Sequence, residues 1–282
     1  MRGFAKIICL GFVLAACGGS SDTPPGPLAK HFDDMYIARI PLDQKQSVVT
    51  TNNDYSVAKM ETATAQAQFE ETDSQLHQAR NDEKAAKLQV DSAVSAKKSA
   101  DASADQNRVN QAVKDLHTAE DMDKAAQARV KYLEDYRNYM KIYWRYTQEN
   151  QYWREAQFEA AKAQIAKQNN IAPKGVSYDD YPKQVDARGK RTQAAKERAQ
   201  KAKERVMSTR EGWMKIQHQA DTESGKQTAL WDPMATGGQA PTQVEHPEQA
   251  EIKSMPAVQQ PPAVQQPSAP PAGSDSAPAQ QQ

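Results

Sequence analysis

Large aliphatic and aromatic side chains are scarce in this sequence. Leu, Ile, Val and Phe together number 38 of 282 residues, about 13%, and below about 20% a large conventional core is unusual. Alanine alone supplies 44 residues, more than Leu, Ile and Val combined. Because one methyl group buries little area, a thick globule is disfavoured, whereas thin and closely packed helical rods remain possible.

Net charge and the usual signatures of catalysis are also missing. The 36 basic and 36 acidic residues cancel, which removes a whole-chain argument for nucleic-acid binding. The five histidines are isolated from other residues at metal-ligand spacing, and no phosphate loop, nucleophile elbow or dinucleotide fingerprint occurs. We therefore expect no enzyme, no metal site and no cofactor.

The first seventeen residues carry the most specific pattern. Two positive side chains precede an apolar run at 7–14, which is too short to span a bilayer and is typical of an export signal. The run leads into Leu14-Ala15-Ala16-Cys17, which resembles the lipobox of bacterial lipoproteins. The resemblance implies that residues 1–16 are a signal peptide removed by cleavage, and that Cys17 is acylated with thioether-linked lipid and an N-acyl chain. The alternative is an ordinary secretory signal that happens to end at a cysteine.

The number of cysteines and the residue that follows Cys17 both fit a lipoprotein. Only Cys9 and Cys17 exist, so cleavage would leave one cysteine, used for lipid, and no intrachain disulfide. Several acyl chains, each methylene contributing about 0.8 kcal/mol, would anchor the protein permanently. Gly18, in place of the Asp that retains lipoproteins in the inner membrane of enteric bacteria, points to an outer-membrane anchor with the protein facing the periplasm. Exposure at the cell surface remains an alternative.

The middle of the chain lacks helix-breaking residues. Residues 17–41 are predicted to be a lipidated tether, flexible over 20–30, followed by a short mixed segment. From Leu42 to Ala172 there are then 131 residues without glycine or proline. Such a stretch is either long helix or disorder, and hydrophobic periodicity must decide between them.

The periodicity favours helix. Apolar residues recur at alternating spacings of three and four from Tyr55, and again from Val109, as in coiled coils. The two stripes are out of phase, so we place a hairpin tip near 101–106; the alternative is one continuous helix in a parallel oligomer. A further stripe begins after Pro173 and Gly175. We thus predict helices at about 43–102, 106–169 and 179–222, within a helical coiled-coil domain of residues 42–222.

The predicted fold class is all-α, an elongated antiparallel coiled-coil hairpin joined to a third helix as a partial three-helix bundle. The hairpin portion from about 76 to 130 should project as a two-helix arm of roughly 40 Å. A homo-oligomer formed through the coiled coil is also possible for such stripes. Residues 223–282, with ten prolines between Pro233 and Gln282 and two successive copies of Pro-Ala-Val-Gln-Gln-Pro, are predicted to be a disordered spacer.

Aromatic residues collect at one place. Nine of the nineteen aromatics fall between Tyr132 and Phe158, and five tyrosines keep helical spacing. They are either a widened core face or a platform for glycan or peptide. The five are Tyr132, Tyr136, Tyr139, Tyr143 and Tyr146.

Charge is uneven along the helices. Between Lys183 and Lys215 eleven basic residues face four acidic ones, a balance of +7, whereas residues 54–105 hold ten acids and six bases, a balance of −4. We expect the third helix to lie beside the first, with these charges setting the register. The alternative is a basic surface for anionic lipid, lipopolysaccharide or wall polymer. Its candidate residues are Arg188, Lys190, Arg191 and Arg198.

These features together predict a lipid-anchored structural or adaptor protein of the bacterial cell envelope. In general layout the chain resembles the coiled-coil hairpins of periplasmic efflux adaptor proteins, although it lacks their lipoyl and barrel segments. The expected partners are the membrane, through lipid on Cys17, and another envelope protein or a cell-wall polymer, but no nucleic acid. Alternatives are a holdase similar to the Skp family of periplasmic chaperones, or a surface-exposed adhesion or motility lipoprotein.

Overall fold

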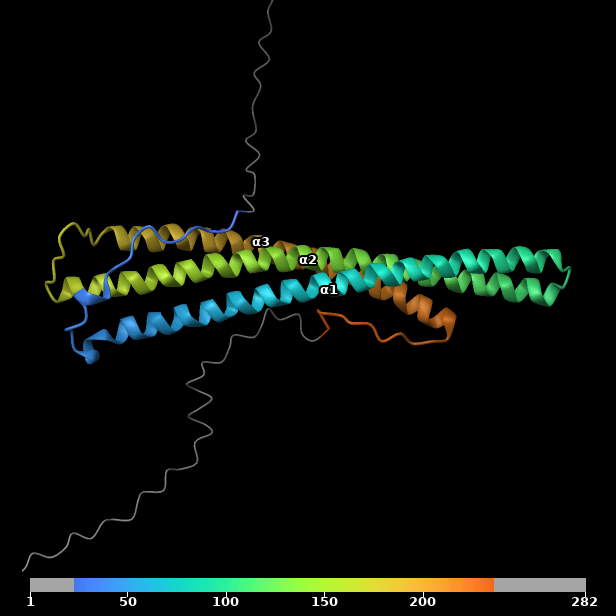
Figure 1. Ribbon diagram of the computed structural model, residues 1–282, viewed down its shortest axis with the longest axis horizontal. Coiled ribbons are helices and arrows are strands. Elements are labelled where there is room, and N and C mark those ends of the chain that lie inside the picture. The colour runs from blue at the N-terminus through green and yellow to red at the C-terminus, as the bar shows by residue number, and fades with distance from the viewer. Residues whose placement is uncertain (1–22, 236–282) are drawn as a thin grey trace, which may run out of the picture. The chain divides into compact units, whose positions relative to one another are not determined.

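The computed structural model describes residues 23–235, and this part of the chain is all-α. Two short 3-10 turns precede three long helices. Figure 1 shows α1 and α2 as an antiparallel hairpin and α3 returning along α2, which confirms the predicted fold class. The elements are the turns Asp34–Tyr36 and Leu42–Lys45, α1 (Gln46–Ala102), α2 (Gln106–Gln168) and α3 (Asp180–Ser224).

The turn between α1 and α2 is tight. Ala104 adopts a left-handed backbone with a φ of 53°, and Asp105 caps the N-terminus of α2. The Asp105 carboxylate accepts hydrogen bonds from the N–H groups of Asn107 at 2.9 Å and Arg108 at 3.3 Å, which satisfies two donors that the helix leaves free. The reversal lies where the sequence placed it, and the alternative of one continuous helix is wrong.

The end of α2 is specified equally clearly. Asn170 has a φ of 55°, its N–H donates to the Lys167 carbonyl at 3.1 Å, and the Ile171 N–H donates to the Ala166 carbonyl at 3.0 Å. This pair of hydrogen bonds is a Schellman motif. The chain then turns through Gly175, whose φ is 79°, and α3 begins at Asp180.

The α1–α2 interface follows the predicted stripe. The Thr62 hydroxyl donates across it to the Thr147 carbonyl at 3.0 Å, so the two backbones approach closely where side chains are small. Further toward the hairpin turn, Arg129 of α2 pairs with Asp82 of α1 at 2.9 Å. All the buried residues of α1 lie on the stripe counted from Tyr55, and they are Ala58, Ala65, Thr72, Leu76, Ala79 and Ala100.

The third helix packs along α2, not along α1. Its Thr192 hydroxyl donates to the Glu149 carbonyl at 3.1 Å, and its Arg205 pairs with Asp135 of α2 at 3.0 Å. The expected pairing of basic α3 with acidic α1 is therefore wrong. The physical reason is that α2 carries the large aromatic side chains, which give α3 more apolar area than the alanine stripe of α1 could.

The two-helix arm is shorter than predicted because α3 reaches further along the hairpin. Trp213 stacks on Tyr132 with ring centroids 5.2 Å apart, and Gln217 lines the same depression as Ala85 and Met122. Only the part of the hairpin between about Met122 and the α1–α2 turn lacks a third helix. At 1.5 Å per residue, that leaves an arm of about 27 Å in place of 40 Å.

Both ends of the described chain pack onto the bundle. The predicted tail boundary at 223 differs from the structure: α3 continues to Ser224, Gly225 turns the chain with a φ of 66°, and Met234 then joins the core formed by Tyr132 and Val206. The prediction of a flexible tether over 20–30 also differs from the structure, because Leu28 is buried.

The export signal, Cys17 and residues 236–282 lie outside the described residues. Within 23–235, no helix is long and apolar enough to cross a membrane.

Candidate functional site

The five predicted tyrosines form a continuous row of ring contacts along α2, which we call the tyrosine ladder. Successive ring centroids lie 6.4, 6.0, 5.9 and 5.9 Å apart from Tyr132 to Tyr146. The spacing of four and three residues keeps all five side chains on one side of the helix. This arrangement was foreseeable from the sequence alone.

Most of the ladder serves packing. Tyr132 is fully buried and Tyr139 nearly so, and the Trp231 ring meets Tyr136 edge-on at 6.3 Å. Burial raises the pKa of Tyr136 to about 12, so its phenol stays neutral at physiological pH. Tyr143 is half-buried, and burial raises its pKa as well. These contacts favour the interpretation as a core face over that of a ligand platform.

Arg188 holds the N-terminal segment against α3. Its guanidinium donates to the carbonyls of Gly26 at 2.8 Å and Pro27 at 2.9 Å and lies over the Tyr152 ring at 5.2 Å. Arg188 is 9% exposed, so it is an internal clamp and does not belong to an exposed interaction surface. Four residues earlier on α3, the Gln184 amide exchanges two 3.0 Å hydrogen bonds with the backbone of Lys30.

A buried charge network fixes the same segment at the α2–α3 end of the bundle. Glu159 accepts a 2.5 Å hydrogen bond from the Phe32 N–H and pairs with Lys162 at 2.9 Å. Lys162 also reaches Asp34 at 2.9 Å, so each buried charge has a partner, as buried charges require. Sequence reasoning missed this network; the only signal was that both α2 charges flank the apolar stripe.

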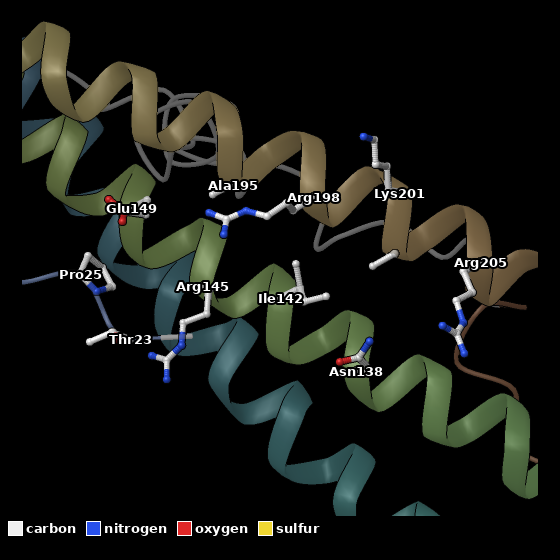
Figure 2. A pocket seen from close by; sticks show the side chains of 11 residues that line it. Thr23, Pro25, Asn138, Ile142, Arg145, Glu149, Ala195, Arg198, Lys201 and Arg205 are labelled. Carbon is white, nitrogen blue, oxygen red and sulfur yellow. The ribbon is translucent and has the colours of Figure 1, made fainter. Parts of the chain in front are cut away.

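A groove of about 410 Å³ lies between α2 and α3. Its walls are α2 residues between Asn138 and Glu149, α3 residues between Ala195 and Arg205, and the N-terminal residues Thr23 and Pro25. Figure 2 shows Arg198 reaching from α3 toward Glu149, and Arg145 extending from α2 on the side of Thr23 and Pro25. We call this the basic groove.

The basic groove has more positive than negative charge. Four of its side chains are cationic and one, Glu149, is acidic. Glu149 already faces Arg188 at 3.8 Å, and Arg205 faces Asp135 at 3.0 Å. Within the part of the chain that the structure describes, no carboxylate pairs with the remaining three cations. They are Arg145, Arg198 and Lys201.

The predicted basic surface is thus divided by the structure. Arg198 lines the basic groove, whereas Lys190 and Arg191 are exposed and Arg188 is buried. Sequence analysis did not single out Arg145, which α2 contributes from between two ladder tyrosines. The spacing of Arg198, Lys201 and Arg205 by three and four residues was the available signal for a common face.

The remaining chemistry of the chain is sparse. Among residues 23–235, no group of three His, Cys, Asp or Glu side chains comes together as a metal site would require. Comparison of the chain with protein-family models, with curated proteins and with solved structures gives no match. What the chain does must therefore be argued from its own residues.

Proposed function

We propose that this chain is a lipid-anchored structural or adaptor protein of the bacterial cell envelope, which holds a helical rod at the membrane and offers its arm to another envelope component. The proposal assigns no chemical reaction to the chain. It combines the lipobox-like sequence at Cys17 with the arrangement of the N-terminal segment on the bundle.

The docked N-terminal segment is the observation that carries the proposal. A lipid anchor can position a rod only if the chain between them is short and held. Arg188 and Gln184 bind the backbone at Gly26, Pro27 and Lys30, and Thr23 already lies against α2 and α3. Few residues remain between the bundle and Cys17, so the proposed anchor would fix where the rod stands.

The arm supplies a surface for a partner. From about Met122 to the hairpin turn there is no third helix, so α2 exposes there the side that α3 covers along the rest of the bundle. Leu88 on α1 is 68% exposed and supplies an apolar side chain on this arm. We place the partner contact on this arm.

Fractionation of cells tests the anchor. The Cys17→Ala variant should move from the membrane to the soluble fraction, because it has no thiol to carry lipid. Cys9→Ala is the matched control, since Cys9 lies within the predicted signal, and it should stay with the membrane. Membrane retention of both variants would contradict lipid anchoring at Cys17.

Crosslinking in intact cells tests the adaptor role. A photoreactive residue at Leu88 should capture one partner in constant proportion, and the same probe at Met214, which is 46% exposed on α3, should not capture it. Capture of many unfolded outer-membrane proteins would instead support the holdase alternative. Removal of the C-terminal region by external protease on unpermeabilised cells would support the surface-exposed alternative.

A further inference from the structure

We propose that the basic groove binds the phosphate-bearing headgroup of an anionic phospholipid. This inference rests on the proposed lipid anchor, which would bring the groove to a membrane surface. The alternative source of the same chemistry is a free phosphate ester, and the experiment below separates the two.

The charges of the groove suit a phosphate. Arg145, Arg198 and Lys201 have no carboxylate partner among the described residues, while Glu149 is balanced by Arg188. One terminal nitrogen of the Arg145 guanidinium donates to Gln148 at 2.7 Å. Since a guanidinium carries five N–H donors, this group has donor capacity left for an acceptor.

The composition of the walls suits a headgroup with its glycerol. Two guanidinium groups from different helices can present planar donor pairs to phosphate oxygens, the geometry in which Arg binds phosphate best. Ile142, Ala195 and Pro25 supply apolar wall beside them. A volume of about 410 Å³ falls within the range of small-ligand sites and admits a headgroup.

Only a short stretch of chain separates the groove from the proposed lipid on Cys17. Thr23 forms part of the wall and follows Cys17 by six residues. Six residues span at most about 20 Å, so a lipidated Cys17 would hold this wall of the groove close to the headgroup layer. Attraction of a cation to an anionic membrane acts only near the surface, and the basic groove includes Thr23, close in the chain to the proposed anchor.

The test uses the mature chain, residues 17–282, made without its export signal and therefore without lipid. Binding is measured by flotation with vesicles of phosphatidylcholine alone or with 30% phosphatidylglycerol. The unmodified chain should bind only the anionic vesicles, and the double variant Arg145→Gln/Arg198→Gln should bind them roughly 10- to 30-fold more weakly, from about 1 kcal/mol per basic residue. Circular dichroism confirms that each variant is folded.

A matched double variant decides whether the groove or mere charge is responsible. Lys196→Gln/Lys203→Gln removes the same charge from α3 positions outside the groove, and it should bind nearly as the unmodified chain does. Equal loss in both double variants, or no binding to anionic vesicles, would overturn the proposal.

Competition with a soluble phosphate ester separates the two sources of phosphate. Soluble glycerol 3-phosphate should compete only at high concentration. Full competition at micromolar levels would identify a free phosphate ester as the ligand and overturn the assignment to lipid. Because the chain used in this test carries no lipid, a failure to bind vesicles would not bear on whether Cys17 is lipidated, which the fractionation experiment tests separately.

Discussion

The phenol of Tyr132 donates a 2.7 Å hydrogen bond to the carboxylate of Asp232, one hundred residues further along the chain. The guanidinium of Arg210 donates to the other oxygen of the same carboxylate at 2.8 Å. One acid therefore joins α2, α3 and the segment that follows Gly225. Trp231 and Met234, on either side of it, pack against the tyrosine ladder and the core.

We predict that Asp232→Ala releases this segment from the bundle. The change leaves the buried Tyr132 hydroxyl and the Arg210 guanidinium without their acceptor, which costs about 1–3 kcal/mol. Limited proteolysis should cut between 226 and 235 faster, and Trp231 fluorescence should shift to longer wavelength. Asp101→Ala, which removes an exposed acid paired only with Lys97 at the hairpin tip, should change neither signal. Unaltered proteolysis of Asp232→Ala would show that the apolar contacts alone hold the segment.

Acid should weaken the same junction. Burial acts to raise the pKa of Asp232, but hydrogen bonds from Arg210, Tyr132 and the Met234 N–H outweigh it and leave the pKa below its usual range. The hydrogen bond from Arg137 likewise lowers the pKa of Asp73. A carboxyl whose pKa is lower in the folded state contributes stability above its unfolded pKa of about 3.9, and that stability is lost as pH falls toward the folded value.

The free energy of unfolding, measured with denaturant, should therefore drop between about pH 4 and pH 2. The double variant Asp73→Asn/Asp232→Asn should be less stable at pH 7 but show a shallower decline in this window. A decline as steep as that of the unmodified chain would mean that other carboxyls are responsible.

Much of the fold could be predicted because the helices are specified locally. The absence of glycine and proline over 42–172, the phase change of the apolar stripes and the residues around Asn170 each mark a structural feature without reference to distant contacts. The register of the small seam residues, such as Ala65 and Thr72, follows directly from spacing.

What sequence could not predict depends on contacts between distant segments. The choice of α2 over α1 as the support of α3 is decided by aromatic area, which overrides the opposite charges of the helices. The docking of residues 23–41 and 226–235 depends on single side chains, Arg188 and Asp232, that meet backbone or acids far away in the chain. The basic groove exists only because one such segment forms a wall beside Arg145 and Arg198.

Core packing on α2 should dominate stability. Leu133 is fully buried, so Leu133→Ala should lower the free energy of unfolding by about 2–5 kcal/mol. The same change at exposed Leu88 should alter it by no more than about 0.5 kcal/mol. Chemical denaturation followed by circular dichroism measures both. Similar losses in the two variants would contradict the burial difference.

The two glycines inside α3 offer a matched pair. Glycine in a helix interior is about 1 kcal/mol less favourable than alanine, and a Cβ added at Gly212 would meet nothing within 4 Å. Gly212→Ala should therefore stabilise the protein by about that amount and raise its Tm by about 2–4 °C. At Gly189 the new Cβ would lie 3.2 Å from Nε1 of Trp153, and overpacking of this kind costs about 1–3 kcal/mol. Gly189→Ala should thus be neutral or destabilising, although its gain in helix propensity is the same. If thermal denaturation gave equal increases for both variants, α3 would have to lie further from Trp153 than it does here.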